Sequence, residues 1–139
     1  MTATADISAQ ERTYDTDALR LDAGFDGLKI LRGQSDSLVL WIGVVKPVDV
    51  SRLLAESPNA VAQAKIFEAN YRQGIWTALL GVAIWPTIYG INHIGTNQPV
   101  PLAVTFVSVA LVGYGATRID TAKRALSKAI WWYNRDLKK

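Results

Sequence analysis

A run of 45 residues without a single Asp, Glu, Lys or Arg, residues 73–117, limits what this chain can fold into. Charged residues make up 19% of the 139-residue chain, so their absence from one block is a strong local feature. About 20 apolar residues suffice for one membrane crossing as a helix. The block is therefore long enough for two crossings and a turn, which we place at about 74–91 and 101–119.

Helix signals stand on both sides of this block. Ser57 followed by Pro58 is typical of a helix start, because the hydroxyl accepts a helical N–H and proline has none to leave unpaired. We expect one helix over 58–91, kinked where Pro86 removes a backbone hydrogen bond. Residues 120–139 have the spacing of a basic amphipathic helix, with an apolar side that includes Leu126 and Tyr133.

The first 50 residues differ in character. Residues 1–17 are polar and are expected to form a tail. Apolar runs rich in β-formers at 18–22, 28–31 and 37–45 alternate with glycine-containing turn signals and predict three strands. Residues 51–72 are expected to form an amphipathic helix that leads into the membrane. The predicted fold is thus a mainly α membrane protein, a two-span transmembrane hairpin with a small β-rich N-terminal piece outside the membrane.

Charge distribution indicates an orientation. Residues 1–58 hold six basic and nine acidic side chains, whereas 59–139 hold nine basic and three acidic ones. The expected loop between the spans, 92–100, has no Lys or Arg. Because basic residues flank membrane helices on the cytoplasmic side, we expect both termini in the cytoplasm of a bacterium, with the protein in the inner membrane.

Candidate contact residues follow from this placement. Basic and tryptophan side chains suit anionic lipid headgroups; here they are Lys123, Arg124, Lys128, Trp131, Trp132 and Arg135. Small residues and proline shape surfaces where membrane helices pack on each other or on a partner; here they are Gly74, Gly81, Pro86, Gly113 and Gly115. The basic charge lacks the motifs of nucleic-acid binding, so no nucleic-acid partner is expected.

No pattern in the sequence predicts catalysis, a metal site or a cofactor. There are no cysteines, and no phosphate-binding loop or nucleophile elbow is present. His93 is the single histidine, and as a lone imidazole near an expected membrane surface it leaves one alternative open. It could ligate the metal of a haem or of a chlorophyll or bacteriochlorophyll. A solvated loop histidine is the competing interpretation.

The end of the chain, 125–137, closes with Ala129, Tyr133, Asn134 and Arg135. This pattern resembles small bacterial two-helix membrane proteins that end in a basic Ala-x-x-x-Tyr-Asn tail. The resemblance covers about the last 80 residues and implies two membrane helices before the tail, but no activity.

The sequence favours a non-catalytic accessory subunit that stabilises a larger bacterial inner-membrane complex. The expected partners are other integral membrane subunits and anionic lipids. An energy-transducing host, such as a photosynthetic reaction centre with its light-harvesting antenna or a respiratory complex, is one hypothesis. The alternatives are a pigment- or haem-binding subunit through His93 and a lipid-binding, membrane-shaping protein.

Overall fold

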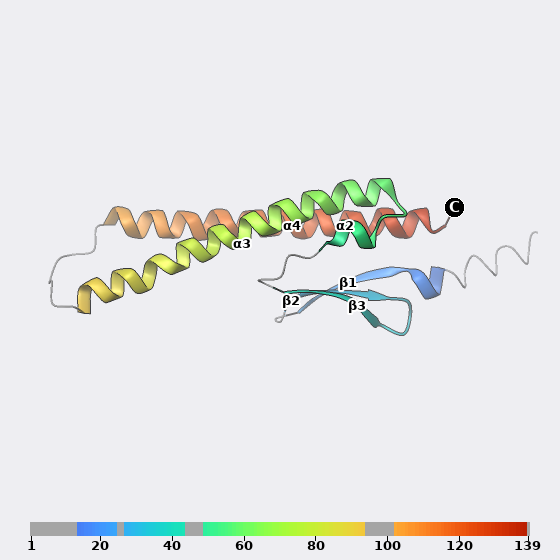
Figure 1. The fold of residues 1–139 in the computed structure, drawn as a ribbon, viewed down its shortest axis with the longest axis horizontal. Coiled ribbons are helices and arrows are strands. Elements are labelled where there is room, and N and C mark those ends of the chain that lie inside the picture. The colour runs from blue at the N-terminus through green and yellow to red at the C-terminus, as the bar shows by residue number, and fades with distance from the viewer. Residues whose placement is uncertain (1–13, 25–26, 44–48, 94–101, 139) are drawn as a thin grey trace, which may run out of the picture. The chain divides into compact units, whose positions relative to one another are not determined.

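A computed structural model of the chain describes residues 14–24, 27–43, 49–93 and 102–138, without the side chains of 87–89 and 91–93. The described elements are β1 (Leu19–Gly24), β2 (Gly27–Arg32), β3 (Ser37–Ile42), α2 (Val50–Leu53), α3 (Pro58–His93) and α4 (Leu102–Asp136). Residues 14–17 add one helical turn before β1. Figure 1 shows the two long helices and the sheet.

The chain divides into two compact units. Unit 1 comprises Met1–Glu68 and Arg124–Lys139, and unit 2 comprises Ala69–Lys123. Both long helices contribute to each unit, so unit 1 holds the sheet, α2, the start of α3 and the end of α4. Unit 2 holds the remaining part of each long helix.

The three predicted strands are present and form the sheet of unit 1, which is antiparallel with strand order β1-β2-β3. Leu19, Leu28, Ile30 and Ile42 bury their side chains on one face, and a register shift after Ile30 marks an irregularity in the pairing of β2 with β3. At the β1–β2 turn Gly27 has φ +129°, and a Cβ there would lie 2.6 Å from the Ile42 carbonyl oxygen. Only glycine fits both constraints.

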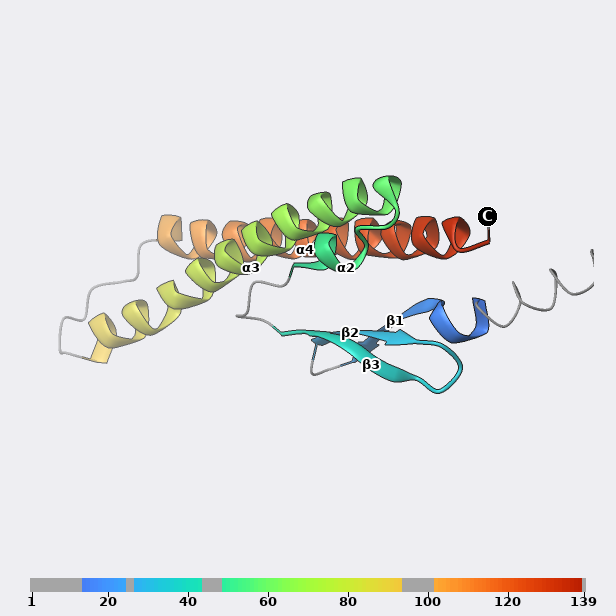
Figure 2. The same cartoon turned by 45° about the vertical axis from the view of Figure 1, so that its right-hand side comes forward.

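The helices of unit 1 supply the other half of its core. On α3, Ala60, Ala64 and Phe67 are buried, so the start of this helix is amphipathic. The single helix expected over 51–72 is wrong, because residues 54–57 separate α2 from α3. On α4 the buried residues are Ala125, Leu126, Ala129, Ile130 and Tyr133. Figures 1 and 2 show the sheet lying along one side of α2 and of the α4 segment in this unit. The amphipathic pattern at the end of the chain is therefore satisfied inside a folded unit.

Side chains cap the starts of α3 and α2, and the start of α3 is the one predicted from the sequence. Ser57 caps α3: its hydroxyl accepts the Ala60 N–H at 3.3 Å and donates to Asp136 Oδ2 at 2.5 Å. That second bond ties the start of α3 to the end of α4. Asp49 caps α2 by accepting the Arg52 N–H at 3.0 Å. The Ser51 hydroxyl and that N–H hold the pKa of the Asp49 carboxyl below its usual value.

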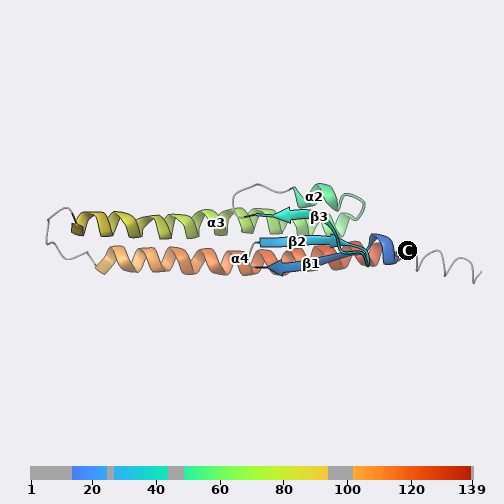
Figure 3. The same ribbon diagram turned by 90° about the horizontal axis from the view of Figure 1, so that it is seen from below.

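Asn134 joins α4 to the outer edge of the sheet. Its Oδ1 accepts the Leu19 N–H and its Nδ2 donates to the Leu19 carbonyl oxygen, both at 2.8 Å. Backbone groups of alternate residues in an edge strand point away from the neighbouring strand. The amide side chain therefore pairs with β1 as another strand would, and Figure 3 shows β1 beneath this end of α4.

The predicted two-span hairpin is wrong. Among the described residues, one helix, α4, is long and apolar enough to cross a membrane. In α3, the uncharged part is diluted by polar and weakly apolar residues that include Gln73, Thr77 and Pro86. The first third of this helix belongs to unit 1. The amphipathic segment predicted at 120–139 is helical as far as Asp136, where it forms the last part of α4, a helix that runs without a break from Leu102. The expected loop at 92–100 falls mostly outside the described residues.

We predict that Asn134→Ala lowers the free energy of unfolding of unit 1 by about 2 kcal/mol, because two hydrogen bonds to backbone groups are lost at about 1 kcal/mol each. Hydrogen exchange of the Leu19 amide should also become faster. The measurement is denaturant unfolding with amide exchange on the full chain. Lys128→Ala, an exposed change on the same helix, is the control. Unchanged protection of the Leu19 amide in Asn134→Ala would refute this role.

Candidate interaction surfaces

The helices of unit 2 are in close contact through glycine. A Cβ on Gly74 would lie 2.8 Å from the Gly115 carbonyl oxygen, and one on Gly115 would lie 2.7 Å from the Gly74 carbonyl oxygen. Seven residues further along α3, about two helical turns, a Cβ on Gly81 would lie 2.9 Å from the Ser108 carbonyl oxygen. The pairs run in opposite directions along the two helices, so α3 and α4 are antiparallel here. Small residues allow this approach.

A buried hydrogen bond accompanies the contact. The Ser108 hydroxyl is fully buried and donates to the Gly81 carbonyl oxygen at 2.7 Å. The hydroxyl thereby finds its partner across the interface, in a place that water does not reach. Of the five residues expected at a packing or docking surface, Gly74, Gly81 and Gly115 lie in this contact. Gly113 faces open space and Pro86 is exposed within α3.

The rest of unit 2 presents apolar side chains outward. Phe106 is 73% exposed and Leu102 is 75% exposed, values unusual for side chains of this size. The exposed apolar residues of unit 2 are Trp76, Leu79, Leu80, Val82, Trp85, Leu102, Phe106, Val107, Val109 and Tyr114. We call this set the apolar surface of unit 2. Clusters of exposed apolar side chains are typical of surfaces that meet lipid or protein.

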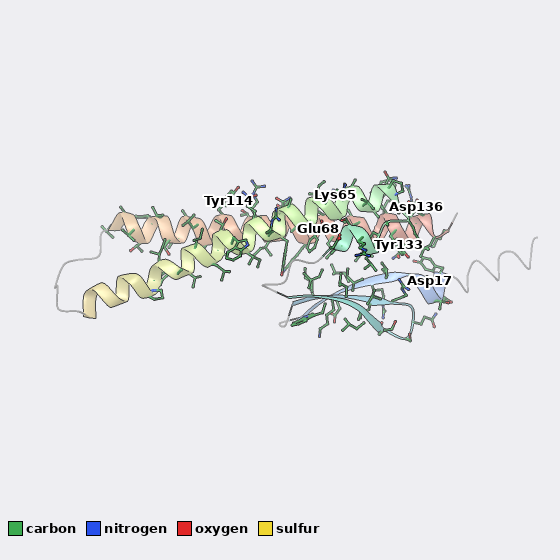
Figure 4. The ribbon with its side chains drawn as sticks, in the orientation of Figure 1. Asp17, Lys65, Glu68, Tyr114, Tyr133 and Asp136 are labelled. Atoms are coloured by element: carbon green, nitrogen blue, oxygen red, sulfur yellow. The ribbon has the colours of Figure 1, made fainter. Side chains whose placement is uncertain are left out.

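Arg118 carries the first charge after the uncharged run, and three hydrogen bonds hold it. Its Nε and Nη2 donate to the Tyr114 hydroxyl at 2.8 and 2.6 Å, and its Nη1 donates to Asn70 Oδ1 at 2.9 Å. Tyr114 is 43% exposed. In Figure 4 it stands out from α4. The sequence analysis missed this group, although an (i, i+4) Tyr–Arg pair at the end of an apolar helix could have indicated it.

The expected headgroup-binding residues fall on the outward side of α4. In unit 1, Arg124, Lys128, Trp131 and Arg135 are exposed, and Trp132 is partly buried. Arg135 lies over the Trp132 ring, with its Cζ 3.7 Å from the ring centroid. Lys123 is exposed in unit 2. The opposite, apolar side of this segment is buried in unit 1, so it is not available to insert into a lipid bilayer. Any contact with lipid headgroups must therefore use the basic side.

Tyr133 and Asn134 belong to the C-terminal pattern described above, and both have structural roles in unit 1. Burial raises the pKa of the Tyr133 phenol, and the Glu56 and Asp17 carboxylates add to the effect, whereas Arg32 opposes it. The phenol is therefore uncharged at neutral pH and acts as a core residue. Figure 4 labels Tyr133 and Asp17. Asn134 holds β1, as described above.

The pigment alternative depends on His93, whose side chain lies outside the described residues, although its backbone ends α3. Within the residues that are described, no group of three His, Cys, Asp or Glu side chains could hold a metal ion. The histidine hypothesis therefore gains no support from the structure, and its competing interpretation gains none either.

Comparison with known proteins gives no match to a family model, a curated protein or a solved structure.

We predict that Gly115→Ala separates the helices of unit 2 and lowers its stability, whereas Gly113→Ala does not. A methyl group at 115 would meet backbone atoms of Gly74 and Ala78 at 2.7–2.8 Å, and one at 113 meets nothing within 4 Å. Gly113→Ala should even stabilise α4 by up to about 1 kcal/mol, since alanine favours helix. Thermal unfolding of both variants in the same detergent tests this. Equal effects of the two substitutions would contradict the glycine contact.

Proposed function

We propose that this protein is a non-catalytic accessory subunit of a larger complex in the bacterial inner membrane, anchored there through α4. The observation that carries the proposal is the apolar stretch of α4, where Leu102, Phe106 and Val109 are exposed and no charged side chain occurs before Arg118. A helix in the core of a soluble protein would have comparable hydropathy but would be buried. The apolar stretch of α4 is mostly exposed.

The charges next to this stretch support an orientation. Arg118, Lys123 and Arg124 follow the apolar part of α4 within seven residues. The positive-inside rule assigns such a cluster to the cytoplasmic side, so the end of α4 that follows the apolar stretch is proposed to face the cytoplasm. The nearby lipid surface is anionic and attracts the same residues.

A subunit role rather than an enzyme role fits the polar groups of unit 1. Asn134 pairs with the edge of β1, Ser57 with Asp136, and Glu68 Oε1 accepts the Ser51 N–H at 2.8 Å. These hydrogen bonds hold elements of unit 1 together, which is a structural use of the groups. The proposed host is an energy-transducing complex, such as a photosynthetic reaction centre with its antenna or a respiratory complex. Its membrane subunits would cover the parts of the apolar surface that lipid does not.

We predict that Phe106→Glu removes the protein from the membrane fraction or prevents its accumulation, because a carboxylate in the hydrocarbon core is destabilising, by up to about 2.5–3.5 kcal/mol at its centre. Leu38→Glu is the matched control: Leu38 is 58% exposed on β3 in unit 1, so the same substitution should leave the protein in the membrane. The measurement is the amount of protein retained in membranes after an alkaline wash. A wild-type protein that washes off, or a Phe106→Glu protein that stays, would contradict membrane anchoring.

We also predict that the wild-type protein, purified from its membranes in a mild detergent, migrates with other integral membrane subunits and separates from them in a harsh one. Native gel electrophoresis with identification of the co-migrating chains is the measurement. A protein that migrates alone at the size of one chain in its micelle would rule out the accessory-subunit role, even if the membrane anchoring holds.

A further inference from the structure

The hydrogen bonds around Arg118 leave donors available in one place. A guanidinium has five N–H donors, and three bonds to Tyr114 and Asn70 use three of them. The Tyr114 hydroxyl oxygen accepts two of those bonds, which occupies its two lone pairs. Its remaining capacity is its own O–H, which must donate to an acceptor. Within the described residues no acceptor for that proton is found.

These donors share one chemical preference. The remaining Arg118 N–H groups carry positive charge and the Tyr114 O–H lies within 2.6–2.8 Å of the same guanidinium nitrogens. An anion with several acceptor oxygens in fixed geometry can accept from both, and phosphate and its esters have this geometry. Holding the guanidinium by Tyr114 and Asn70 also reduces the side-chain entropy lost when such an anion binds.

The position on α4 indicates where the phosphate comes from. Arg118 follows immediately after the uncharged run, at the level where an inserted helix leaves the hydrocarbon and meets the headgroups. On the facing helix, Gly74 lies against Gly115 and Ile119, so the nearby Trp76, which is 61% exposed, lies in the same region. Tryptophan at this depth is typical of membrane interfaces.

We propose that Arg118 and Tyr114 form a binding site for a phosphate group, supplied by the headgroup of an anionic phospholipid. Asn70 is a positioning residue, since it holds Nη1 of Arg118 and turns the guanidinium toward the site. The inference rests on the proposed membrane anchoring and adds to it a specific lipid contact that fixes the depth of α4.

The test measures binding of phosphatidylglycerol to the full-length, delipidated protein in detergent by native mass spectrometry. Arg118→Lys keeps the charge but loses the planar fork, and Tyr114→Phe removes the O–H donor. Each should weaken lipid binding about tenfold, the effect of losing one charge-assisted hydrogen bond. Arg72→Lys, the same exchange at the other end of the uncharged run, is the matched control and should bind as the wild type does. Circular dichroism of each variant confirms that the helices remain.

A second arm replaces the lipid with inorganic phosphate. If phosphate binds with the same dependence on Arg118 and Tyr114 while phosphatidylglycerol does not bind, the phosphate site stands and its ligand is a soluble anion. If both variants bind lipid as the wild type does, or if Arg72→Lys loses as much, the site is refuted. Refutation here with the protein still retained in membranes after an alkaline wash would leave the proposed function intact. A protein that binds phosphate but washes off membranes would retain the phosphate site and refute the membrane anchoring.

Discussion

Unit 2 depends on one constraint: two helices can bury only the sides that face each other. The contacts Gly74–Gly115 and Gly81–Ser108 bring the two backbones close together. At this distance the interface has no room for large side chains, so it buries little apolar surface. Leu80, Phe106 and Val109 consequently point outward. Burying each such side chain is worth about 1.5–3 kcal/mol, so their exposure to water would be a large cost. In the proposed function, lipid and neighbouring membrane subunits cover these side chains and so avoid that cost.

In unit 1, by contrast, the helices cover a sheet that would otherwise be exposed. A three-stranded sheet has two open edges and too small a core to fold alone. The end of α4 closes one edge through Asn134 and covers a face through Leu126, Ile130 and other apolar residues. The start of α3 is fixed to the same part of α4 through Ser57 and Asp136. The segment that sequence patterns suggested as a lipid-binding tail is therefore mainly a structural part of unit 1.

Local signals predicted local structure well. Alternating β-formers located the three strands, and Ser57-Pro58 located the start of α3, because capping and turn chemistry act over a few residues. Composition alone overstated the apolar character of α3, which led to the incorrect two-span hairpin. The contacts of Asn134 with Leu19 and of Ser57 with Asp136 join residues 115 and 79 positions apart. Pairings at such distances depend on tertiary packing, so no single-sequence pattern could predict them.

The central claim is that the apolar part of α4 lies in lipid, and the absence of cysteine from the chain allows a direct test. A spin label at a single cysteine, Phe106→Cys or Lys128→Cys, reports its surroundings in phosphatidylglycerol-containing vesicles. Accessibility to oxygen, which concentrates in lipid, is compared with accessibility to a water-soluble nickel chelate by electron paramagnetic resonance. We expect the label at 106 to favour oxygen strongly and the label at 128 to favour the chelate. Equal preference for the chelate at both positions would contradict the account.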